Sequence, residues 1–100
     1  KNKYNMITLN KVIEHVPNPE KMLNKATKIL SKDGLVYIEV PDIRASKHGK
    51  NREEFHIDHL HVFSKKSLSF LIKQVKLKTK ILKSIEEPSG KFSIFGIFKK

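Results

Sequence analysis

The chain has 100 residues, a formal net charge of +11 and no cysteine. A chain of this length forms at most one small domain. The lack of cysteine excludes a disulfide framework, a thiolate zinc site and a cysteine nucleophile. No apolar run reaches the roughly 18 residues that a membrane span needs. We therefore expect a cytoplasmic protein with no membrane partner.

The first predicted element is a short strand over residues 4–9, which is mostly apolar on both faces. Such a composition is typical of a central parallel strand covered by helices. A helix is then predicted to begin with Asn18 as its cap and Pro19 in its first turn. Its buried stripe would consist of Met22, Leu23, Ala26, Ile29 and Leu30. We expect the helix to end at Asp33-Gly34, with Gly34 in the left-handed conformation.

A second strand is predicted over residues 35–40, where β-branched and aromatic side chains follow the glycine. Strand, helix and strand in this order indicate a parallel crossover. A second helix is predicted after Ser64, which can cap it. The apolar residues Leu68, Leu71, Ile72 and Val75 recur there at helical spacing.

The last two apolar segments, residues 81–86 and 92–98, flank the turn-forming residues 87–91. A turn of this length between two strand-like segments predicts an antiparallel hairpin.

Two stretches of the chain, residues 4–19 and residues 30–41, are similar to a known family in the order and spacing of their strand, turn and helix-start residues. They resemble the C-terminal half of class I S-adenosylmethionine-dependent methyltransferases, in particular the type 11/23 group and quinone O-methyltransferases. The resemblance implies an α/β fold that forms the C-terminal half of a Rossmann-like sheet. It would contain two parallel strands with a crossover helix, a second helix and a C-terminal antiparallel hairpin. Lys76-Leu77 stands where similar enzymes usually have a helix-ending glycine, so the exit from the second helix is not predicted.

The glycine-rich loop of these enzymes is not found in the chain, which has four glycines and none in a G-x-G spacing. We therefore expect residues 1–100 to be a partial methyltransferase domain that binds the cofactor weakly and is inactive by itself. The strand over residues 4–9 would then lack its usual neighbour, and its bare edge would allow self-association.

Asn10, Lys11 and Val12 follow the first strand. In similar methyltransferases this position borders the cofactor, partly through backbone groups, so the resemblance assigns these three residues to S-adenosylmethionine. The alternative is an ordinary turn between a strand and a helix, with solvated polar side chains.

Glu14 and His15 are the candidate catalytic residues. Similar RNA-terminus and quinone O-methyltransferases hold a divalent metal with a Glu-x-x-Glu-His motif at these positions. Here the first position is Lys11, whose ammonium repels a cation and has no lone pair, so we predict no metal ion. The pair could instead position an acceptor hydroxyl or act as a general base. The alternative is that the pair only ties the turn to the helix.

Three histidines and a carboxylate crowd into residues 56–61. Their spacing lacks a helical His-x-x-x-His metal pair, whereas similar methyltransferases often carry an Asp-His-x-His-x-Phe-Ser stretch before this helix. The matching residues are Asp58, His59, His61, Phe63 and Ser64. In an extended segment His59 and His61 would point to one side. We assign both histidines and Asp42 to substrate binding and residues 42–55 to a substrate lid, with packing or metal binding as alternatives.

The resemblance implies a parent enzyme that moves a methyl group from S-adenosylmethionine to an oxygen or nitrogen of a small-molecule or sugar-like acceptor. Two alternatives are a non-catalytic basic module that binds RNA or another polyanion, and a remnant that folds poorly. The positive charge comes almost entirely from lysine, since Arg44 and Arg52 are the only arginines. Because phosphate and base recognition favour arginine, we interpret most lysines as solvated charge and do not favour nucleic acid as a partner.

Overall fold

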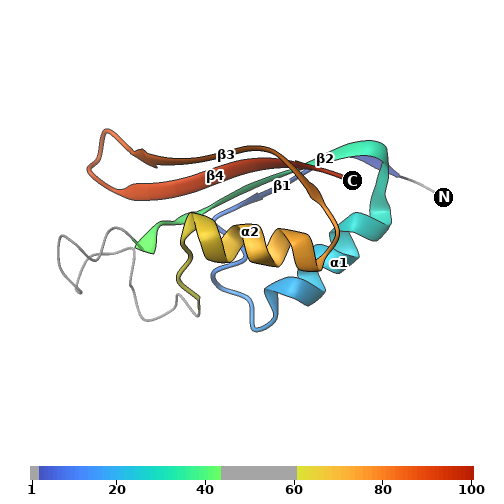
Figure 1. The fold of residues 1–100 in the computed structure, drawn as a ribbon, viewed down its shortest axis with the longest axis horizontal. Helices are drawn as coiled ribbons and strands as arrows, with labels where there is room; N and C mark the ends of the chain where they lie inside the picture. The colour runs from blue at the N-terminus through green and yellow to red at the C-terminus, as the bar shows by residue number, and fades with distance from the viewer. Residues whose placement is uncertain (1–2, 44–60) are drawn as a thin grey trace.

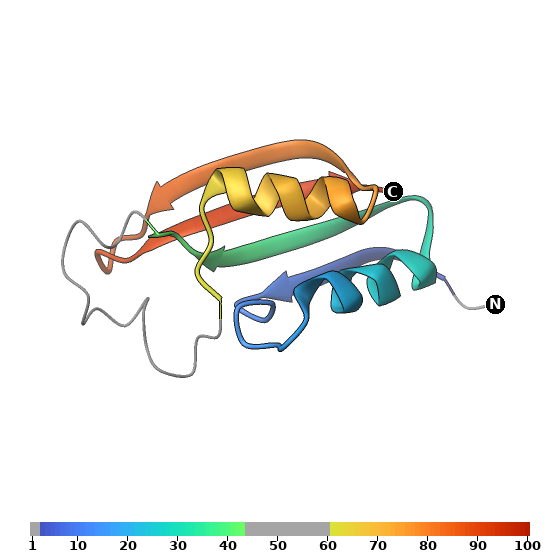
Figure 2. The same cartoon turned by 60° about the horizontal axis from the view of Figure 1, so that its bottom comes forward.

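The computed structural model describes residues 3–43 and 61–100 as a sheet with two helices on one of its faces (Figures 1 and 2). In chain order the elements are β1 (Tyr4–Asn10), α1 (Pro19–Ile29), β2 (Leu30–Pro41), α2 (Lys65–Gln74), β3 (Lys78–Glu86) and β4 (Phe92–Lys99). Within the described residues, neither helix has the length and apolar character needed to cross a membrane.

The sheet has the strand order β1-β2-β4-β3. β1 and β2 are parallel and α1 connects them, whereas β4 is antiparallel to both β2 and β3. This topology confirms the predicted α/β fold, with a crossover helix, a second helix and a C-terminal hairpin. The carboxyl ends of β1 and β2 lie at the same edge of the sheet, and in open α/β folds this edge is where ligand sites form.

The hydrophobic core lies between the sheet and the helices. Its fully or almost fully buried members include Leu23 of α1, Val36, Ile38 and Val40 of β2, Leu68 and Ile72 of α2, and Ile94 and Phe98 of β4. Because side chains alternate along a strand, Tyr37 and Glu39 of β2 face the other side of the sheet. No helix of the described residues covers that side (Figure 1).

Within the described residues β1 is an edge strand, which agrees with the bare edge expected from the sequence, but helices cover one face of the sheet and not both. Ile7 and Leu9 pack against the core, but Tyr4 and Met6 are 54% and 48% exposed. Within the described part of the chain, β1 has β2 as its single neighbour. An apolar composition alone does not say how many neighbours a strand has.

α1 ends at Ile29 and not at Asp33-Gly34 as predicted. Leu30 is already extended, fully buried and paired with Tyr4 of β1. Asp33 rather than Gly34 adopts the left-handed conformation, with φ 66°, and Ile29 is 46% exposed instead of lying in the buried stripe. Strand pairing and burial of Leu30 therefore outweigh the local helical pattern.

α2 begins as predicted. The Ser64 hydroxyl accepts a hydrogen bond of 3.0 Å from the Ser67 backbone N–H, and the Ser67 hydroxyl accepts one of 2.9 Å from the Ser64 backbone N–H. This reciprocal capping box satisfies two backbone donors that a helix start leaves free.

The exit from α2 uses a lysine where similar enzymes have glycine. Lys76 adopts a left-handed φ of 63°. Its N–H donates to the Lys73 carbonyl at 3.0 Å, and the Leu77 N–H donates to the Ile72 carbonyl at 3.1 Å. These two bonds form a Schellman motif, which ends a helix and reverses the chain.

Candidate functional site

The candidate site lies where β1 and β2 end. Asn10, the last residue of β1, is paired in register with Glu39 of β2. The next residue, Lys11, donates its backbone N–H to the Glu39 carbonyl at 2.8 Å and then turns sharply with φ 59°. Asn10 is exposed and Val12 is partly buried. The three residues assigned to the cofactor from the sequence therefore form the rim of the strand end.

The Lys11 side chain enters a cluster of polar groups from distant parts of the chain. Its Nζ lies 3.2 Å from Ser93 Oγ, 3.5 Å from Glu87 Oε2 and 3.6 Å from Glu39 Oε2. We call Lys11, Tyr37, Glu39, Glu87 and Ser93 the strand-end cluster. It joins the turn after β1 to β2, to β4 and to the hairpin turn.

Hydrogen bonds inside the strand-end cluster shift two pKa values. The Ser93 hydroxyl donates to Glu87 and is the main cause that lowers the pKa of this carboxyl, with a contribution from Lys11, while partial burial acts in the opposite direction. The Tyr37 hydroxyl donates to Glu39 Oε1 at 2.7 Å. Burial, assisted by this hydrogen bond, raises the pKa of Tyr37 to about 12. Tyr37 is therefore a neutral donor at physiological pH.

Four members of the strand-end cluster were not predicted as site residues, namely Tyr37, Glu39, Glu87 and Ser93. Glu39 lies in the middle of an apolar strand and Glu87 in a polar turn, and each looks like an ordinary surface residue in its local context. Sequence separations of 76 and 82 residues join Lys11 to Glu87 and Ser93. The one available signal is the alternation of Tyr37 and Glu39 with apolar residues in β2, which puts both polar side chains on one face.

Glu14 is buried in the turn that follows β1. Its side chain is 1% exposed, and neither carboxylate oxygen has a hydrogen-bond partner. The nearest charged group is His15, whose Nε2 lies 3.5 Å from Glu14 Oε2 and whose side chain is 36% exposed. The His15 backbone N–H donates to the Val12 carbonyl at 3.0 Å, which closes a tight turn. The two predicted catalytic residues thus form a buried carboxylate next to a solvent-accessible imidazole.

His61 returns to this turn from a distant segment. Its backbone N–H donates to the Glu14 carbonyl at 3.1 Å, and its Nε2 lies 2.9 Å from the Val16 carbonyl oxygen. A carbonyl only accepts hydrogen bonds, so Nε2 carries a proton and Nδ1 is the ring nitrogen left for other contacts. The structure therefore brings Glu14, His15 and His61 together.

Asp42 is buried at the end of β2 and connects to the same returning segment. It forms an isolated parallel bridge with Phe63, and the Ile43 N–H donates to the Phe63 carbonyl at 2.7 Å. Asp42 thus lies on the strand next to the one that leads to Glu14. His59, Asp58 and residues 44–55 of the predicted lid lie outside the described residues.

No group of three or more potential metal ligands forms a metal site within residues 3–43 and 61–100. Lys11, which stands where metal-binding relatives have a glutamate, directs its ammonium into the strand-end cluster.

Comparison with known proteins gives a family and a set of similar folds. Residues 1–79 match the family described as methyltransferase domain, whereas no curated protein matches the chain. The fold is similar to that of a SAM-dependent methyltransferase, possible histamine N-methyltransferase, from Thermotoga maritima, with 19% identity and a TM-score of 0.74. The alignment covers 99% of this chain and 57% of that one.

Two other solved structures are similar over 99% of this chain. One is a SAM-dependent methyltransferase from Methanosarcina mazei, with 15% identity, a TM-score of 0.74 and 60% of its chain covered. The other is the Burkholderia thailandensis 1,6-didemethyltoxoflavin-N1-methyltransferase with bound 1,6-didemethyltoxoflavin and S-adenosylhomocysteine, with 17% identity, a TM-score of 0.77 and 44% coverage. The chain thus spans about half the length of these proteins. The TM-scores show a shared fold, and the low identities limit the conclusion to the fold. Because the family match covers 79 of the 100 residues, the chain belongs to the methyltransferase domain family.

Proposed function

We propose that the protein transfers a methyl group from S-adenosylmethionine to an oxygen or nitrogen of a small-molecule or sugar-like acceptor. In this proposal residues 1–100 supply the acceptor side of the site and part of the cofactor floor, as a partial domain that is inactive alone. Membership of the methyltransferase domain family supports the reaction class. The main support for Glu14 as the residue that contacts the acceptor is its buried carboxylate.

Glu14 needs a hydrogen-bond donor. A buried polar group without a partner costs about 1–3 kcal/mol, and native structures keep few such groups. Both oxygens of Glu14 lack a hydrogen-bond partner among the described residues. An acceptor with an O–H or N–H group would supply the missing donor, so the carboxylate suits the type of nucleophile that the proposal names.

The proton released by the acceptor goes to the Glu14–His15 pair. S-adenosylmethionine, when bound, supplies an electrophilic methyl group on a positively charged sulfur. Glu14 accepts the hydrogen bond from the attacking O–H or N–H and takes up its proton, and His15, 3.5 Å away and partly exposed, can pass it to solvent. Asp42, His59 and His61 orient the acceptor in this proposal, because correct alignment supplies a large part of the rate acceleration in a displacement reaction.

The residues at the strand end fit a cationic cofactor. Asn10, Lys11 and Val12 would contact S-adenosylmethionine at the rim. Behind them the strand-end cluster contains two carboxylates, Glu39 and Glu87, and a single ammonium, that of Lys11, so its formal charge is −1. The Lys11 ammonium is already paired and is therefore less able to repel a sulfonium group.

The cofactor assignment is tested by isothermal titration of S-adenosylmethionine and S-adenosylhomocysteine. The titrations use the 100-residue chain and a form of the protein extended upstream of Lys1. We expect the extended form to bind both compounds and the chain alone to bind them weakly or not at all. If a folded extended form binds neither compound, the cofactor proposal is wrong.

The role of Glu14 is tested in the extended form with Glu14→Gln, which keeps the size of the side chain and removes the base. We expect kcat to fall by about 10²- to 10⁴-fold while the affinity for the cofactor stays the same. Glu20→Gln, at an exposed glutamate in the first turn of α1, is the matched control and should leave kcat unchanged. A Glu14→Gln enzyme with normal kcat would exclude Glu14 as the base.

A further inference from the structure

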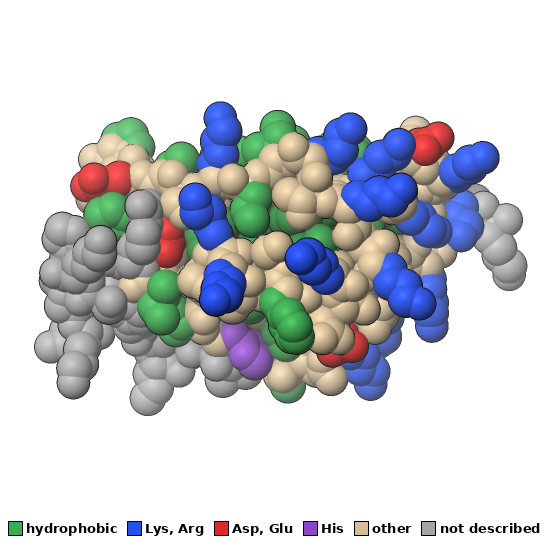
Figure 3. Space-filling model, viewed as in Figure 1, with side chains coloured by type: hydrophobic (Ala, Val, Ile, Leu, Met, Phe, Trp, Pro, Cys, Tyr) green, Lys and Arg blue, Asp and Glu red, His purple; other side chains and the backbone are tan. Residues whose placement is uncertain are grey.

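The two helices present a basic surface on one side of the sheet. We define the basic helical face by its exposed lysines, namely Lys21, Lys25 and Lys28 of α1 and Lys65, Lys66 and Lys73 of α2. The single carboxylate on the two helices is Glu20. Figure 3 shows many Lys side chains and few acidic ones on the side of the molecule that displays α2.

No ion pair within the described residues involves a lysine of the basic helical face. The ion pairs of lysine in the described part of the chain involve Lys11 and Lys99, which belong to the sheet side of the molecule. The carboxylates of Glu39 and Glu87 both pair with Lys11 on that side. The positive charge of the basic helical face is therefore not neutralised by carboxylates of the described residues. Such a surface attracts an anionic partner.

An exposed aromatic ring lies within this positive surface. Phe70 of α2 is 64% exposed, the highest value among the large hydrophobic side chains of the described residues. Lys66 lies one helical turn before it and Lys73 one turn after it, so all three share a face of α2. The ring is thus an apolar platform between two cations.

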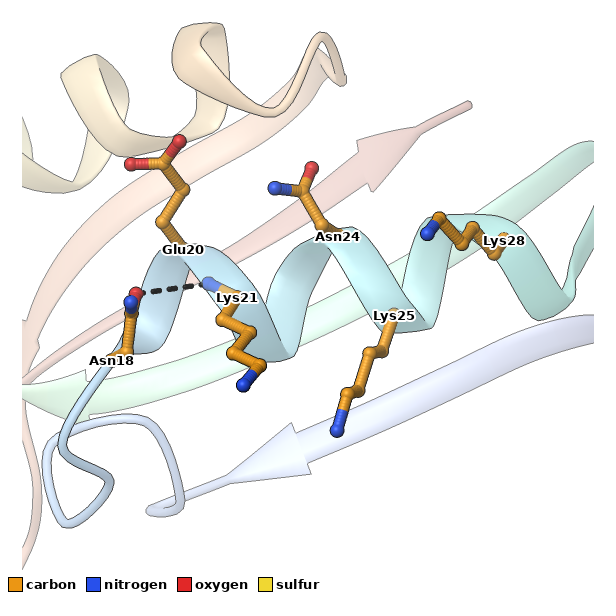
Figure 4. Close-up of a pocket in the computed structure, with 6 residues that line it drawn as sticks. All are labelled: Asn18, Glu20, Lys21, Asn24, Lys25 and Lys28. Carbon is orange, nitrogen blue, oxygen red and sulfur yellow. Dashed lines mark hydrogen bonds between the residues drawn. The ribbon is translucent and has the colours of Figure 1, made fainter.

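The outer surface of α1 is hollowed. A shallow cavity of about 420 Å³ is lined by Asn18, Glu20, Lys21, Asn24, Lys25 and Lys28. Figure 4 shows Lys21 and Lys25 extending from the side of α1 that faces away from α2, whereas Glu20 and Asn24 extend toward α2. A second hollow of about 390 Å³ shares Asn18, Lys21 and Lys25 and adds Val16, Pro17 and Met22. With three lysines and one glutamate, the first cavity has a formal charge of +2.

We propose that the basic helical face binds single-stranded nucleic acid, with phosphates on the lysines and one base stacked on Phe70. Proteins that bind single strands without sequence preference combine a positive track with aromatic platforms in this way. The use of lysine rather than arginine fits phosphate neutralisation without base reading. The second hollow borders the Glu14 turn through Val16 and Pro17, but the inference does not depend on the proposed methyl transfer.

Two other kinds of partner fit the surface less well. Lysine is depleted in protein interfaces, whereas six lysines make up this face. A membrane-surface helix needs a broad free apolar face, but Leu68 and Ile72 of α2 are buried in the core, and the free apolar group is Phe70.

Binding is measured by fluorescence anisotropy of a labelled single-stranded oligouridine of about 12 nucleotides, titrated with the 100-residue chain at several salt concentrations. The variants are Lys21→Gln/Lys25→Gln/Lys28→Gln on α1 and, as a control with the same change in net charge, Lys78→Gln/Lys80→Gln/Lys83→Gln on β3. We expect the α1 variant to lower the slope of log K against log salt by about 2, since each phosphate contact contributes about 0.7. The β3 variant should keep the wild-type slope.

Phe70→Ala tests the stacking platform, with Ile85→Ala at another exposed hydrophobic residue as control. We expect Phe70→Ala to weaken oligouridine binding by about tenfold and Ile85→Ala to have no effect. All of these side chains are exposed, so thermal melts by circular dichroism should show that each variant folds. The proposal is overturned if the wild-type chain does not bind oligouridine, or if the α1 and β3 lysine variants lose the same affinity for it. It is also overturned if poly-L-glutamate binds as tightly as oligouridine and Phe70→Ala has no effect. That last result would indicate an acidic protein partner.

Discussion

The ammonium of Lys11 lies 3.5 Å from the carboxylate of Glu87, although 76 residues separate them in the chain. This contact ties the turn that carries Glu14 and His15 to the hairpin between β3 and β4. Lys11 is 34% exposed, Glu87 27% and Glu39 19%, so water screens the strand-end cluster less than it screens an ordinary surface ion pair.

We therefore predict that Lys11→Met lowers the free energy of unfolding by about 1–2 kcal/mol, because two partly buried carboxylates lose their shared cation. The measurement is the midpoint of urea unfolding. Lys99→Met is the matched control, since its ion pair with Asp33 is more exposed, and we expect a loss below about 1 kcal/mol. Equal losses in the two variants would show that the strand-end cluster adds no more than a surface pair.

Glu87 makes the stability depend on acid pH. Its pKa in the folded chain lies below the ordinary value of 4.5, mainly because the Ser93 hydroxyl donates to it. The unfolded chain then binds the proton more readily, so this contribution to stability is present above about pH 4.5 and is lost as the pH falls through the lower folded pKa. Urea midpoints measured through this range should fall less steeply for Ser93→Ala than for wild type. Ser89→Ala, at an exposed serine in the same turn, should behave like wild type.

Tyr37 has the opposite pH dependence. Burial raises its pKa from 10.0 to about 12 in the folded chain, so the unfolded chain loses this proton first as the pH rises. The stabilisation is complete below pH 10 and is lost as the pH approaches 12. Absorbance at the tyrosinate band should show one phenol that titrates late, and Phe at position 37 should remove it. If a phenol that titrates late remains in Tyr37→Phe, the assignment of the raised pKa to Tyr37 is wrong.

Lys76→Gly should stabilise the protein. Lys76 has φ 63° at the end of α2, and a left-handed conformation costs a residue with a Cβ about 1 kcal/mol. Its exposed side chain contributes little packing. We expect a gain of about 0.5–1 kcal/mol in the free energy of unfolding, read from thermal or urea melts. Gln74→Gly, two residues earlier within the helix, should destabilise, because glycine there has no such benefit.

Gly34→Ala should destabilise by about 1–3 kcal/mol through steric overlap. A Cβ at this position would lie 2.5 Å from Leu30 Cγ and 2.9 Å from the Ser31 carbonyl oxygen, and Leu30 is fully buried. A double-mutant cycle with Leu30→Ala checks this cause. The added cost of Gly34→Ala should be smaller in the Leu30→Ala background, and an unchanged cost would assign the effect to the backbone instead.

Local signals in the sequence determined most of the elements. Asn18 before Pro19 and Ser64 before α2 marked both helix starts, because caps act on backbone groups within three residues. β-branched and aromatic composition located β2, helical spacing of apolar residues located α2, and the turn residues 87–91 located the C-terminal hairpin, since each signal lies within one short segment. The family resemblance, and with it the α/β fold class, followed from the order of these elements.

Tertiary structure decided the features that depend on residues far apart in the chain. α1 ends at Ile29 because Leu30 pairs with Tyr4, and Tyr4 and Met6 of β1 are exposed because they lie on the face of the sheet that no helix of the described residues covers. The same holds at the site, where His61 bonds to the Glu14 turn and Glu87 and Ser93 surround Lys11. Such contacts depend on packing and charge between residues that are far apart in the chain. They produce no periodicity or spacing in the local sequence, so they become visible only in the folded chain.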